Sequence, residues 1–342
     1  MNIFIIIFAL VLIFVLSFTF NDCLDLLSKV YGHGLSRDQS DPFEISGRQI
    51  VIEAMLQPPF LAEDNPEPRL LVRTYDQNTN ETIKDIDYRI IGEFKNETVI
   101  DQRFHAVDGI ISANIIPSND TNLQYITGKD NEQIQLSKAD LIEVGLSNPV
   151  NLKGNIMSDG GLYEFKVILE KSSKGLDLDS DKTVDLFISI GKTYPFVISE
   201  NKSNNELTNN IKESNNTGSL IFKVKSYYDE ITDFTYDKEN SIISFRMPFT
   251  WNLDYVNQIL TLHEELVFPK SQTQLSKVSS FTGKLNNMEI PTNFILVDDF
   301  SDEIDRIVHI VVPNFKLKEY ADKITKDGGN STAFFEIKPV KN

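Results

Sequence analysis

A strand-like alternation of side chains constrains the fold of this chain more than any other feature of its sequence. Apolar residues occupy every second position from Tyr163 to Leu169, and most of the residues between them are charged. This period of two is typical of a β-strand that covers a core with one face and meets water with the other. The segment therefore predicts one wall of a β-sandwich.

Other segments are short, rich in β-branched residues and bounded by Pro, Gly, Asn or Asp, as strands are. They are residues 49–56, 69–75, 88–94, 110–116, 184–190, 220–224, 241–247, 262–268, 294–297, 307–312 and 333–337. Apolar residues recur at intervals of three and four in residues 253–260 and 315–324, which predicts short helices there. We expect an all-β protein of mostly antiparallel sheets.

A polar stretch divides the chain. Residues 199–218 have no apolar periodicity and consist mainly of Asn, Ser and charged residues, which indicates a linker or a long surface loop. It separates residues 43–198 from residues 219–340, and each part has the size of a domain. We expect two β-sandwich modules.

The start of the alternating strand carries a further signature, Asp159-Gly160-Gly161-Leu162-Tyr163. It resembles the tyrosine corner of immunoglobulin-like sandwiches, in which the phenol bonds backward to the backbone. Antibody domains have a cysteine two residues after that tyrosine, and Phe165 stands there in this chain. The resemblance implies immunoglobulin-like modules held by packing instead of a disulfide.

The first residues of the chain form an apolar run from Met1 to Phe20. An uncleaved anchor is one interpretation, because about 20 apolar residues span a bilayer. A signal peptide cleaved after Gly32 is the other, since Val30 and Gly32 loosely match the small residues of a cleavage site. Residues 1–32 are thus a signal peptide or a membrane anchor, and both place the rest of the chain, after a hydrophobic helix, at the cell surface or outside the cell.

Composition agrees with export. Cys23 is the single cysteine, so a chain beginning at His33 forms no internal disulfide. The formal net charge of −17 argues against neutralisation of nucleic-acid phosphates. Asn-x-Ser/Thr triplets, mostly in segments that resemble loops, make glycosylation a hypothesis. The acceptors would be Asn80, Asn96, Asn119, Asn201, Asn215 and Asn330.

At a larger scale the chain is similar to a group of secreted proteins of ammonia-oxidising archaea that have no assigned activity. This resemblance implies the same compartment and a layout of two modules. It lies in His33-Gly34-Leu35-Ser36, Ser46-Gly47-Arg48-Gln49, Gln57-Pro58-Pro59-Phe60-Leu61, Asp159-Gly160-Gly161-Leu162-Tyr163, Met247-Pro248-Phe249-Thr250-Trp251 and Arg306-Ile307-Val308-His309.

Two metal sites can be proposed from the sequence. If cleavage follows Gly32, the terminal His33 offers its α-amine and Nδ1 to one ion, an environment that copper favours. This resembles the copper brace of certain monooxygenase subunits and polysaccharide oxidases. The second candidate is a calcium site in the acidic turn Asp177, Asp179, Asp181 and Asp185, although an EF-hand is excluded there. The acidic segment 298–305 makes a similar, weaker case.

No catalytic motif is complete. His263-Glu264-Glu265 would need a second histidine where Val267 stands to form a metalloprotease motif. His309 lies in a predicted strand and is interpreted as a core or edge residue. Nucleophile elbows, phosphate loops and dinucleotide fingerprints are absent from the sequence.

These features predict an exported cell-surface protein with a structural or binding role. Its partners would be cell-envelope proteins or glycans, together with the membrane if the first segment is not cleaved. The alternative is a metal-binding extracellular protein, with copper at His33 or calcium at the acidic turn.

Overall fold

The computed structural model describes residues 36–58, 60–61, 68–118, 120, 123–126, 133–199, 219–271, 273–326 and 331–340. Residues 1–32, where the sequence predicts a signal peptide or anchor, lie outside this set. The same holds for residues 200–218 of the predicted linker. Of the helices in the described segments, none combines the length and the apolar character that a membrane crossing requires.

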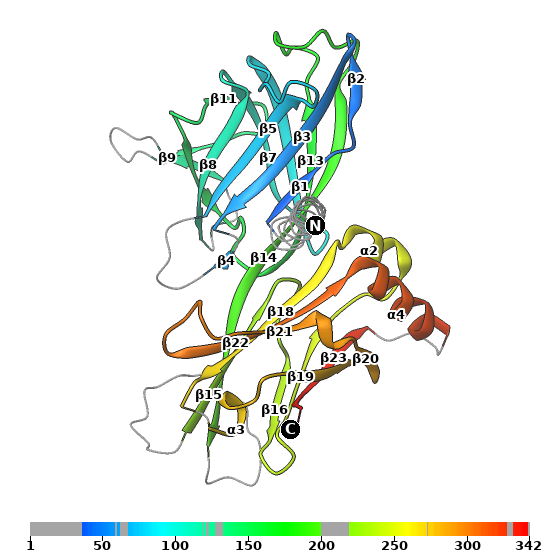
Figure 1. Cartoon of the computed structure of the whole chain (residues 1–342). Helices are drawn as coiled ribbons and strands as arrows, with labels where there is room; N and C mark the ends of the chain where they lie inside the picture. The colour runs from blue at the N-terminus through cyan, green and yellow to red at the C-terminus, as the bar shows by residue number, and fades with distance from the viewer. Residues whose placement is uncertain are drawn as a thin grey trace, which may run out of the picture.

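The all-β prediction is confirmed, because strands dominate the described chain (Figure 1). The strands up to residue 199 are β1 (Arg37–Gln39), β2 (Phe43–Ile45), β3 (Arg48–Gln57), β4 (Phe60–Leu61), β5 (Arg69–Asp76), β6 (Ile86–Phe94), β7 (Glu97–Ala106), β8 (Ile110–Pro117), β9 (Gln124–Ile126), β10 (Gln133–Gln135), β11 (Leu141–Val144), β12 (Val150–Gly154), β13 (Gly161–Leu169) and β14 (Lys182–Ser199).

The remaining strands are β15 (Ser219–Ser226), β16 (Asp233–Asp237), β17 (Ile242–Pro248), β18 (Thr261–Pro269), β19 (Phe281–Leu285), β20 (Met288–Ile290), β21 (Ile295–Asp298), β22 (Asp305–Pro313) and β23 (Thr332–Pro339). The helices are α2 (Leu253–Gln258), α3 (Thr273–Ser276), α4 (Asn314–Lys326) and a 3₁₀ turn at Thr292–Phe294. Every strand predicted from the sequence overlaps one of these elements, and so do the helices predicted at residues 253–260 and 315–324. The predicted N-terminal hydrophobic helix lies outside the described residues.

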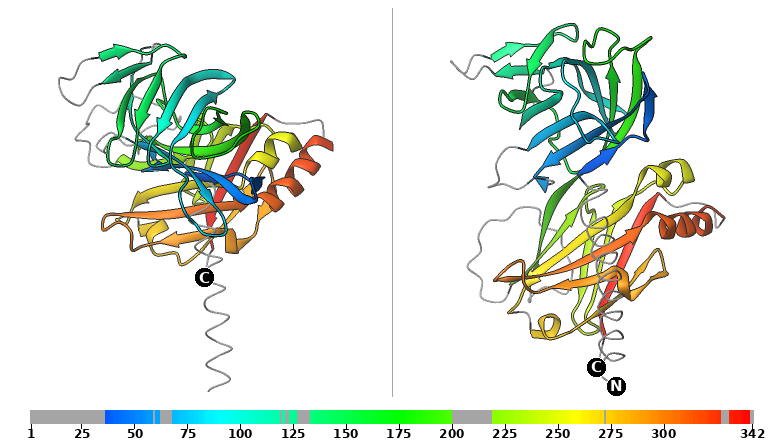
Figure 2. Two further views of the ribbon diagram at one scale, coloured as in Figure 1. Left: turned by 90° about the horizontal axis from the view of Figure 1, so that it is seen from above. Right: turned by 45° about the horizontal axis from the view of Figure 1, so that its top comes forward.

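Two sheets enclose a first core. One has the order β1-β3-β5-β8-β12-β9-β10, with β2 beside β3. It packs against the β7-β6-β13-β14 part of a ten-stranded sheet, and Figure 2 shows the two layers from other sides. Ile52, Val72, Tyr88 and Phe165 from the two layers lie in one buried cluster. In β5 and β13 the buried residues alternate with half-buried ones, so one face of each strand lies in the core.

A second core lies between the rest of the ten-stranded sheet and a five-stranded one. The first layer continues as β15-β18-β22-β21, and the second has the order β16-β17-β23-β19-β20. Phe222, Leu266, Phe245 and Phe335 meet in this core. Helix α4 covers its end with an apolar face that includes Leu317 and Tyr320.

The strand β14 belongs to both cores. Its residues Lys182–Ile190 pair with β13, and its residues Lys192–Ser199 pair with β15. Leu186 is buried in the first core and Phe196 in the second. The change from one core to the other therefore occurs inside one strand, as the green ribbon of Figure 1 shows, before the polar stretch 200–218 begins.

The predicted backward bond of Tyr163 is confirmed. Its hydroxyl donates to the carbonyl oxygen of Asp159 at 2.9 Å, and its ring stacks on Phe94 with centroids 4.4 Å apart. Gly161, which lies between Asp159 and Tyr163 in the sequence, has a φ of 147°. A Cβ at this position would lie 2.6 Å from the Phe94 ring. The glycine is thus required by the close approach of that ring, and Phe165 fills the position of the missing cysteine inside the core.

Replacing Tyr163 with Phe should lower the free energy of unfolding by about 1 kcal/mol, the usual net value of one hydrogen bond. The change removes only the hydroxyl and leaves the Asp159 carbonyl without this donor. Denaturant unfolding measures the loss. Tyr125→Phe is the control, because the Tyr125 hydroxyl has no hydrogen-bond partner among the described residues, and it should change the free energy much less. Equal effects of the two variants would contradict a role for the corner.

Candidate functional site

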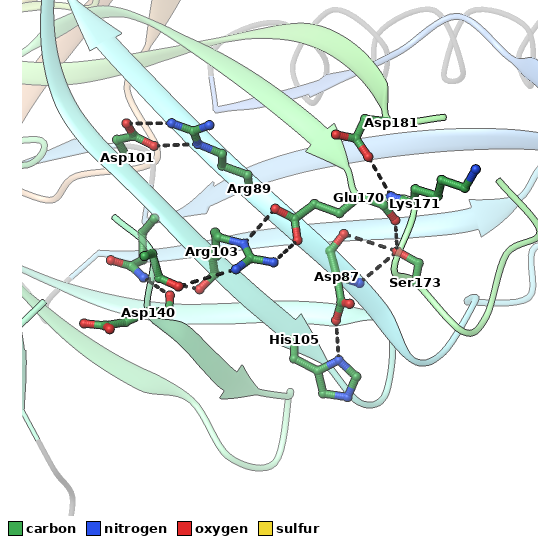
Figure 3. A network of polar contacts seen from close by, with 12 residues as sticks. Asp87, Arg89, Asp101, Arg103, His105, Asp140, Glu170, Lys171, Ser173 and Asp181 are labelled. Atoms are coloured by element: carbon green, nitrogen blue, oxygen red, sulfur yellow. Dashed lines mark hydrogen bonds and ion pairs between the residues drawn. The ribbon is translucent and has the colours of Figure 1, made fainter. Parts of the chain in front are cut away.

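Of the metal ligands predicted from the sequence, the structure describes the four aspartates of the acidic segment. His33 lies outside the described residues. Asp177, Asp179, Asp181 and Asp185 are exposed. The Asp181 carboxylate accepts from the Lys171 backbone N–H at 2.7 Å, and Figure 3 shows this contact. Asp177, Asp179 and Asp181 lie between β13 and β14, whereas Asp185 lies within β14. Calcium binding there stays a prediction.

Two of the predicted glycosylation acceptors can be located. Asn80 and Asn96 are exposed and have φ values of 57° and 65°, as expected for turns. Asn119, Asn201, Asn215 and Asn330 lie outside the described residues. Glycosylation itself stays a prediction.

A network of charged residues covers the outer face of β6 and β7 (Figure 3). His105 Nδ1 lies 2.6 Å from Asp87 Oδ1, a geometry also found in catalytic triads. The nearby Ser173 hydroxyl, however, donates to the Glu170 carbonyl and accepts from the Asp87 N–H. Because that serine is bonded to backbone and not to the imidazole, the group is interpreted as an ion-pair network.

A different group of residues has the chemistry of a metal site. His263 and Glu265 are two residues apart on β18, so their side chains share one face of the sheet. His309 on β22 lies directly opposite Glu265 in the antiparallel register. Leu262 and Leu266, on either side of them in the sequence, are buried in the second core, and Glu264 between them is a buried carboxyl. The sheet thus uses one face for packing and gathers polar side chains on the other.

The ligand atoms of this group converge. His263 Nε2 lies 3.2 Å from His309 Nδ1, and Glu265 Oε1 lies 3.8 Å and 3.9 Å from these two nitrogens. Two nitrogens at 2.0–2.1 Å from one tetrahedral ion are about 3.3 Å apart. Among the described residues, this is the group of three potential ligands whose donor atoms all lie within 4.8 Å of one another.

Neighbouring side chains hold Glu265 in place. The Tyr227 hydroxyl donates to Glu265 Oε1 at 3.1 Å, and the Lys225 ammonium donates to Oε2 at 3.3 Å. The Tyr227 ring also stacks on His263 at 5.1 Å. Gly191 permits this arrangement, because a Cβ at that position would lie 2.7 Å from the tyrosine ring. Gly191, at which β14 passes from the first core to the second, therefore leaves room for the tyrosine that contacts Glu265 and His263.

Burial sets the charge state of this group. It lowers the pKa of His263 to about 4, although the Glu265 carboxylate acts in the opposite direction. His263 is therefore neutral at neutral pH and has a lone pair available for coordination. Burial and the Glu265 charge raise the pKa of Tyr227, so its hydroxyl stays protonated and can donate.

Asp298 lies on the other side of His309. Its Oδ2 is 3.8 Å from His309 Nε2, the nitrogen that faces away from His263. The Ser301 side chain and the backbone N–H groups of Phe300 and Ser301 lower the pKa of Asp298 to about 2. His309 is thus flanked by one carboxylate at each ring nitrogen, Glu265 and Asp298.

Sequence reasoning missed this group because its members lie in two distant segments. The spacing of His263 and Glu265 was a usable signal, since residues i and i+2 of a strand share a face. Their contact with His309 depends on the pairing of β18 with β22, which follows from no local motif. The interpretation of His309 as a core or edge residue did not include the carboxylates of Glu265 and Asp298 beside it.

The chain matches none of the protein-family models, curated proteins or solved structures with which it was compared. The functional argument therefore rests on the geometry of the site alone.

The ion pairs of Figure 3 generate a pH prediction. Arg89 donates to both oxygens of Asp101, and Lys138 contacts Oδ2 at 2.9 Å. The Arg89 hydrogen bond is the main cause of a lowered pKa for Asp101. When folding lowers the pKa of an acid, its ionised form stabilises the fold at pH values above the unfolded pKa of about 3.9. This contribution disappears as the pH falls through the pKa of the folded state.

Asp101→Asn should therefore be less stable than the wild type at pH 7, and the difference should shrink as the pH falls below about 3.9. Denaturant unfolding at a series of pH values measures both. Asp41→Asn changes an exposed aspartate that forms no ion pair within the described segments, and should leave the pH profile close to that of the wild type. A constant difference between Asp101→Asn and the wild type across this range would contradict the assignment.

Proposed function

We propose that this protein is an exported β-sandwich protein that binds a transition-metal ion through His263, Glu265 and His309. The observation that carries the proposal is the convergence of two imidazole nitrogens and one carboxylate oxygen, with the nitrogens 3.2 Å apart. A network that only satisfies buried hydrogen bonds is the competing explanation. In that explanation, His263 and His309 are joined only by the hydrogen bond between their ring nitrogens.

The donor set indicates which ions would bind. Imidazole nitrogens suit zinc, copper, iron and nickel, whereas calcium and magnesium prefer oxygen ligands. Two histidines and one glutamate occur as the protein ligands of zinc in several enzymes, and they leave a coordination position for water. Zinc or copper is therefore the proposed ion. The proposal concerns binding and names no reaction.

The surroundings also suit a metal ion. Ligating carboxylates in metal sites are usually hydrogen-bonded by further residues, which orient them. The Tyr227 hydroxyl and the Lys225 ammonium supply such bonds to Glu265. Because His263 is neutral at neutral pH, it need not be deprotonated from the imidazolium form before a metal ion binds.

Export is part of the same proposal and is supported by the apolar run of residues 1–20. The intact mass of the protein from its native cell tests it. A mass that begins at Met1 would support an anchor. A mass that begins at His33 would support a secreted product and would retain the terminal copper hypothesis.

The immunoglobulin-like character of the modules is likewise proposed. The bond from Tyr163 to the Asp159 carbonyl supports it in the first module, since that bond defines a tyrosine corner. The parallel pairs β7–β11 and β8–β12 are additions to a purely antiparallel sandwich.

A second candidate function is the binding of a cell-surface glycan in a cleft between the two cores. The cleft has a volume of about 820 Å³. Phe94 and Glu164 line it from the first half, and Asn252, Tyr255 and Gln258 from the second. Rings beside amide and carboxylate groups offer both stacking and hydrogen bonds to a sugar.

Metal binding is tested with the full chain by calorimetry and by thermal unfolding with and without Zn²⁺ or Cu²⁺. At a free metal concentration of 100 times Kd, the wild type should gain about 2.7 kcal/mol of stability. His263→Ala, Glu265→Gln and His309→Ala should each weaken binding by roughly 100-fold, about 2.7 kcal/mol, because each removes a ligand.

The matched control for these variants is His105→Ala. It removes a half-buried histidine that also contacts a carboxylate but lies in the first core's ion-pair network. It should bind metal as the wild type does. Wild-type protein that neither retains an ion nor gains stability with one would contradict the metal proposal.

The cleft is tested by Gln258→Trp, which should fill it from an exposed helix position and abolish binding to isolated surface glycans. Asn257→Trp is the control, because Asn257 is the preceding residue of α2 and does not line the cleft. Glycan binding that survives in Gln258→Trp, or is lost equally in both variants, would contradict this second function.

A further inference from the structure

We infer that Asp298 is a positioning residue that fixes the tautomer of His309 and so presents its Nδ1 as a metal ligand. The inference rests on the proposed function in one respect, namely that Nδ1 is the coordinating atom. It assigns to Asp298 a role at the site without direct contact with the ion.

The strand register places Asp298 at the far side of the imidazole. Leu296 is directly opposite His309 in the β21–β22 pair, and Asp298 is directly opposite Ile307. Residues two apart share a face, so Asp298, Ile307 and His309 project to the same side of the sheet. His309 Nε2 then faces Asp298 at 3.8 Å, while Nδ1 faces His263 at 3.2 Å. A shift of about 1 Å brings the first pair to hydrogen-bond distance.

A neutral imidazole carries its proton on one nitrogen and a lone pair on the other. The Asp298 carboxylate favours the proton on His309 Nε2, which leaves the lone pair on Nδ1. Without metal, that lone pair accepts from His263 Nε2–H. For an ion to bind, the His263 proton would move from Nε2 to Nδ1, so that the imidazole stays neutral and Nε2 gains a lone pair; His263 Nε2 and His309 Nδ1 would then hold the ion. Metal-ligating histidines commonly donate their other N–H to a carboxylate in this way.

The following loop fixes the carboxylate of Asp298. Its Oδ1 accepts from the backbone N–H groups of Phe300 at 2.8 Å and Ser301 at 3.0 Å. The Oδ2 is thereby left to face His309. One oxygen thus anchors the side chain to the backbone, and the other acts on the imidazole.

Asp298→Asn separates these two tasks. The Asn oxygen can still accept from the Phe300 and Ser301 N–H groups, but its NH₂ group then faces His309 and donates. The proton of His309 should move to Nδ1, which removes the ligand lone pair. Asp302→Asn is the matched control, because Asp302 Oδ1 likewise accepts from two loop N–H groups, those of Ile304 and Asp305. In the described part of the chain, Asp302 forms no hydrogen bond or ion pair with a histidine.

The experiment measures Zn²⁺ affinity by calorimetry and tautomers by NMR of the full chain labelled with ¹⁵N-histidine, which has only four histidines. We expect Asp298→Asn to bind Zn²⁺ some 10–100-fold more weakly, as for other residues that orient metal-ligating histidines. In its metal-free form, His309 should carry its proton on Nδ1 instead of Nε2. Asp302→Asn should match the wild type in both measurements.

The outcomes separate the inference from the function on which it rests. An unchanged His309 tautomer and unchanged affinity in Asp298→Asn would overturn the role of Asp298, even if the wild type binds zinc. A changed tautomer in a protein whose wild type takes up no zinc or copper would support the positioning of the imidazole and overturn the metal function. Equal losses in Asp298→Asn and Asp302→Asn would assign the effect to the loop and also overturn the inference.

Discussion

The structure depends on the backbone hydrogen bonds of β14, which join two separate cores through one strand. A strand can serve two cores because its side chains alternate and its backbone groups need partners at every position. β13 supplies those partners up to Ile190, and β15 supplies them from Lys192 onward. Gly191 stands at the change and leaves room for the Tyr227 ring. Gly191 therefore lies both at the change between the cores and against the tyrosine that donates to Glu265 of the candidate metal site.

The two-faced sheet of the second half explains how a site can form without a deep pocket. Leu262 and Leu266 fill the core from one face of β18, and His263 and Glu265 lie on the other. Glu264 is an exception, since it is fully buried on the core face and its Oε1 accepts from Ser226. Burial raises its pKa, as expected for a carboxyl with little solvent and few partners.

Local pattern was sufficient for most strands and insufficient for the site. The strand at Gly161–Leu169 and the bond of Tyr163 were predictable because both depend on residues close in sequence. β7 was not predicted, because Gln102 stands in its buried row and breaks the apolar alternation. That glutamine is accommodated by the backbone carbonyl of Asp140, which lies in a distant segment.

The candidate metal site was unpredictable for the same reason. His263 and His309 become neighbours only through a register between β18 and β22 that apolar side chains on the opposite face determine. A sequence pattern can assign a histidine to a strand face, but it cannot assign the residue across from it. Because Asp298 lies on β21, its position beside His309 also depends on the pairing of β21 with β22.

The continuity of β14 has a mechanical consequence. A tension applied across the two halves would pass along the covalent backbone at Gly191. In each half it would then be distributed over many ladder hydrogen bonds that run across the direction of pull. Such bonds are loaded in shear and must yield together, so the junction between the cores should resist stretching better than a flexible tether of equal length.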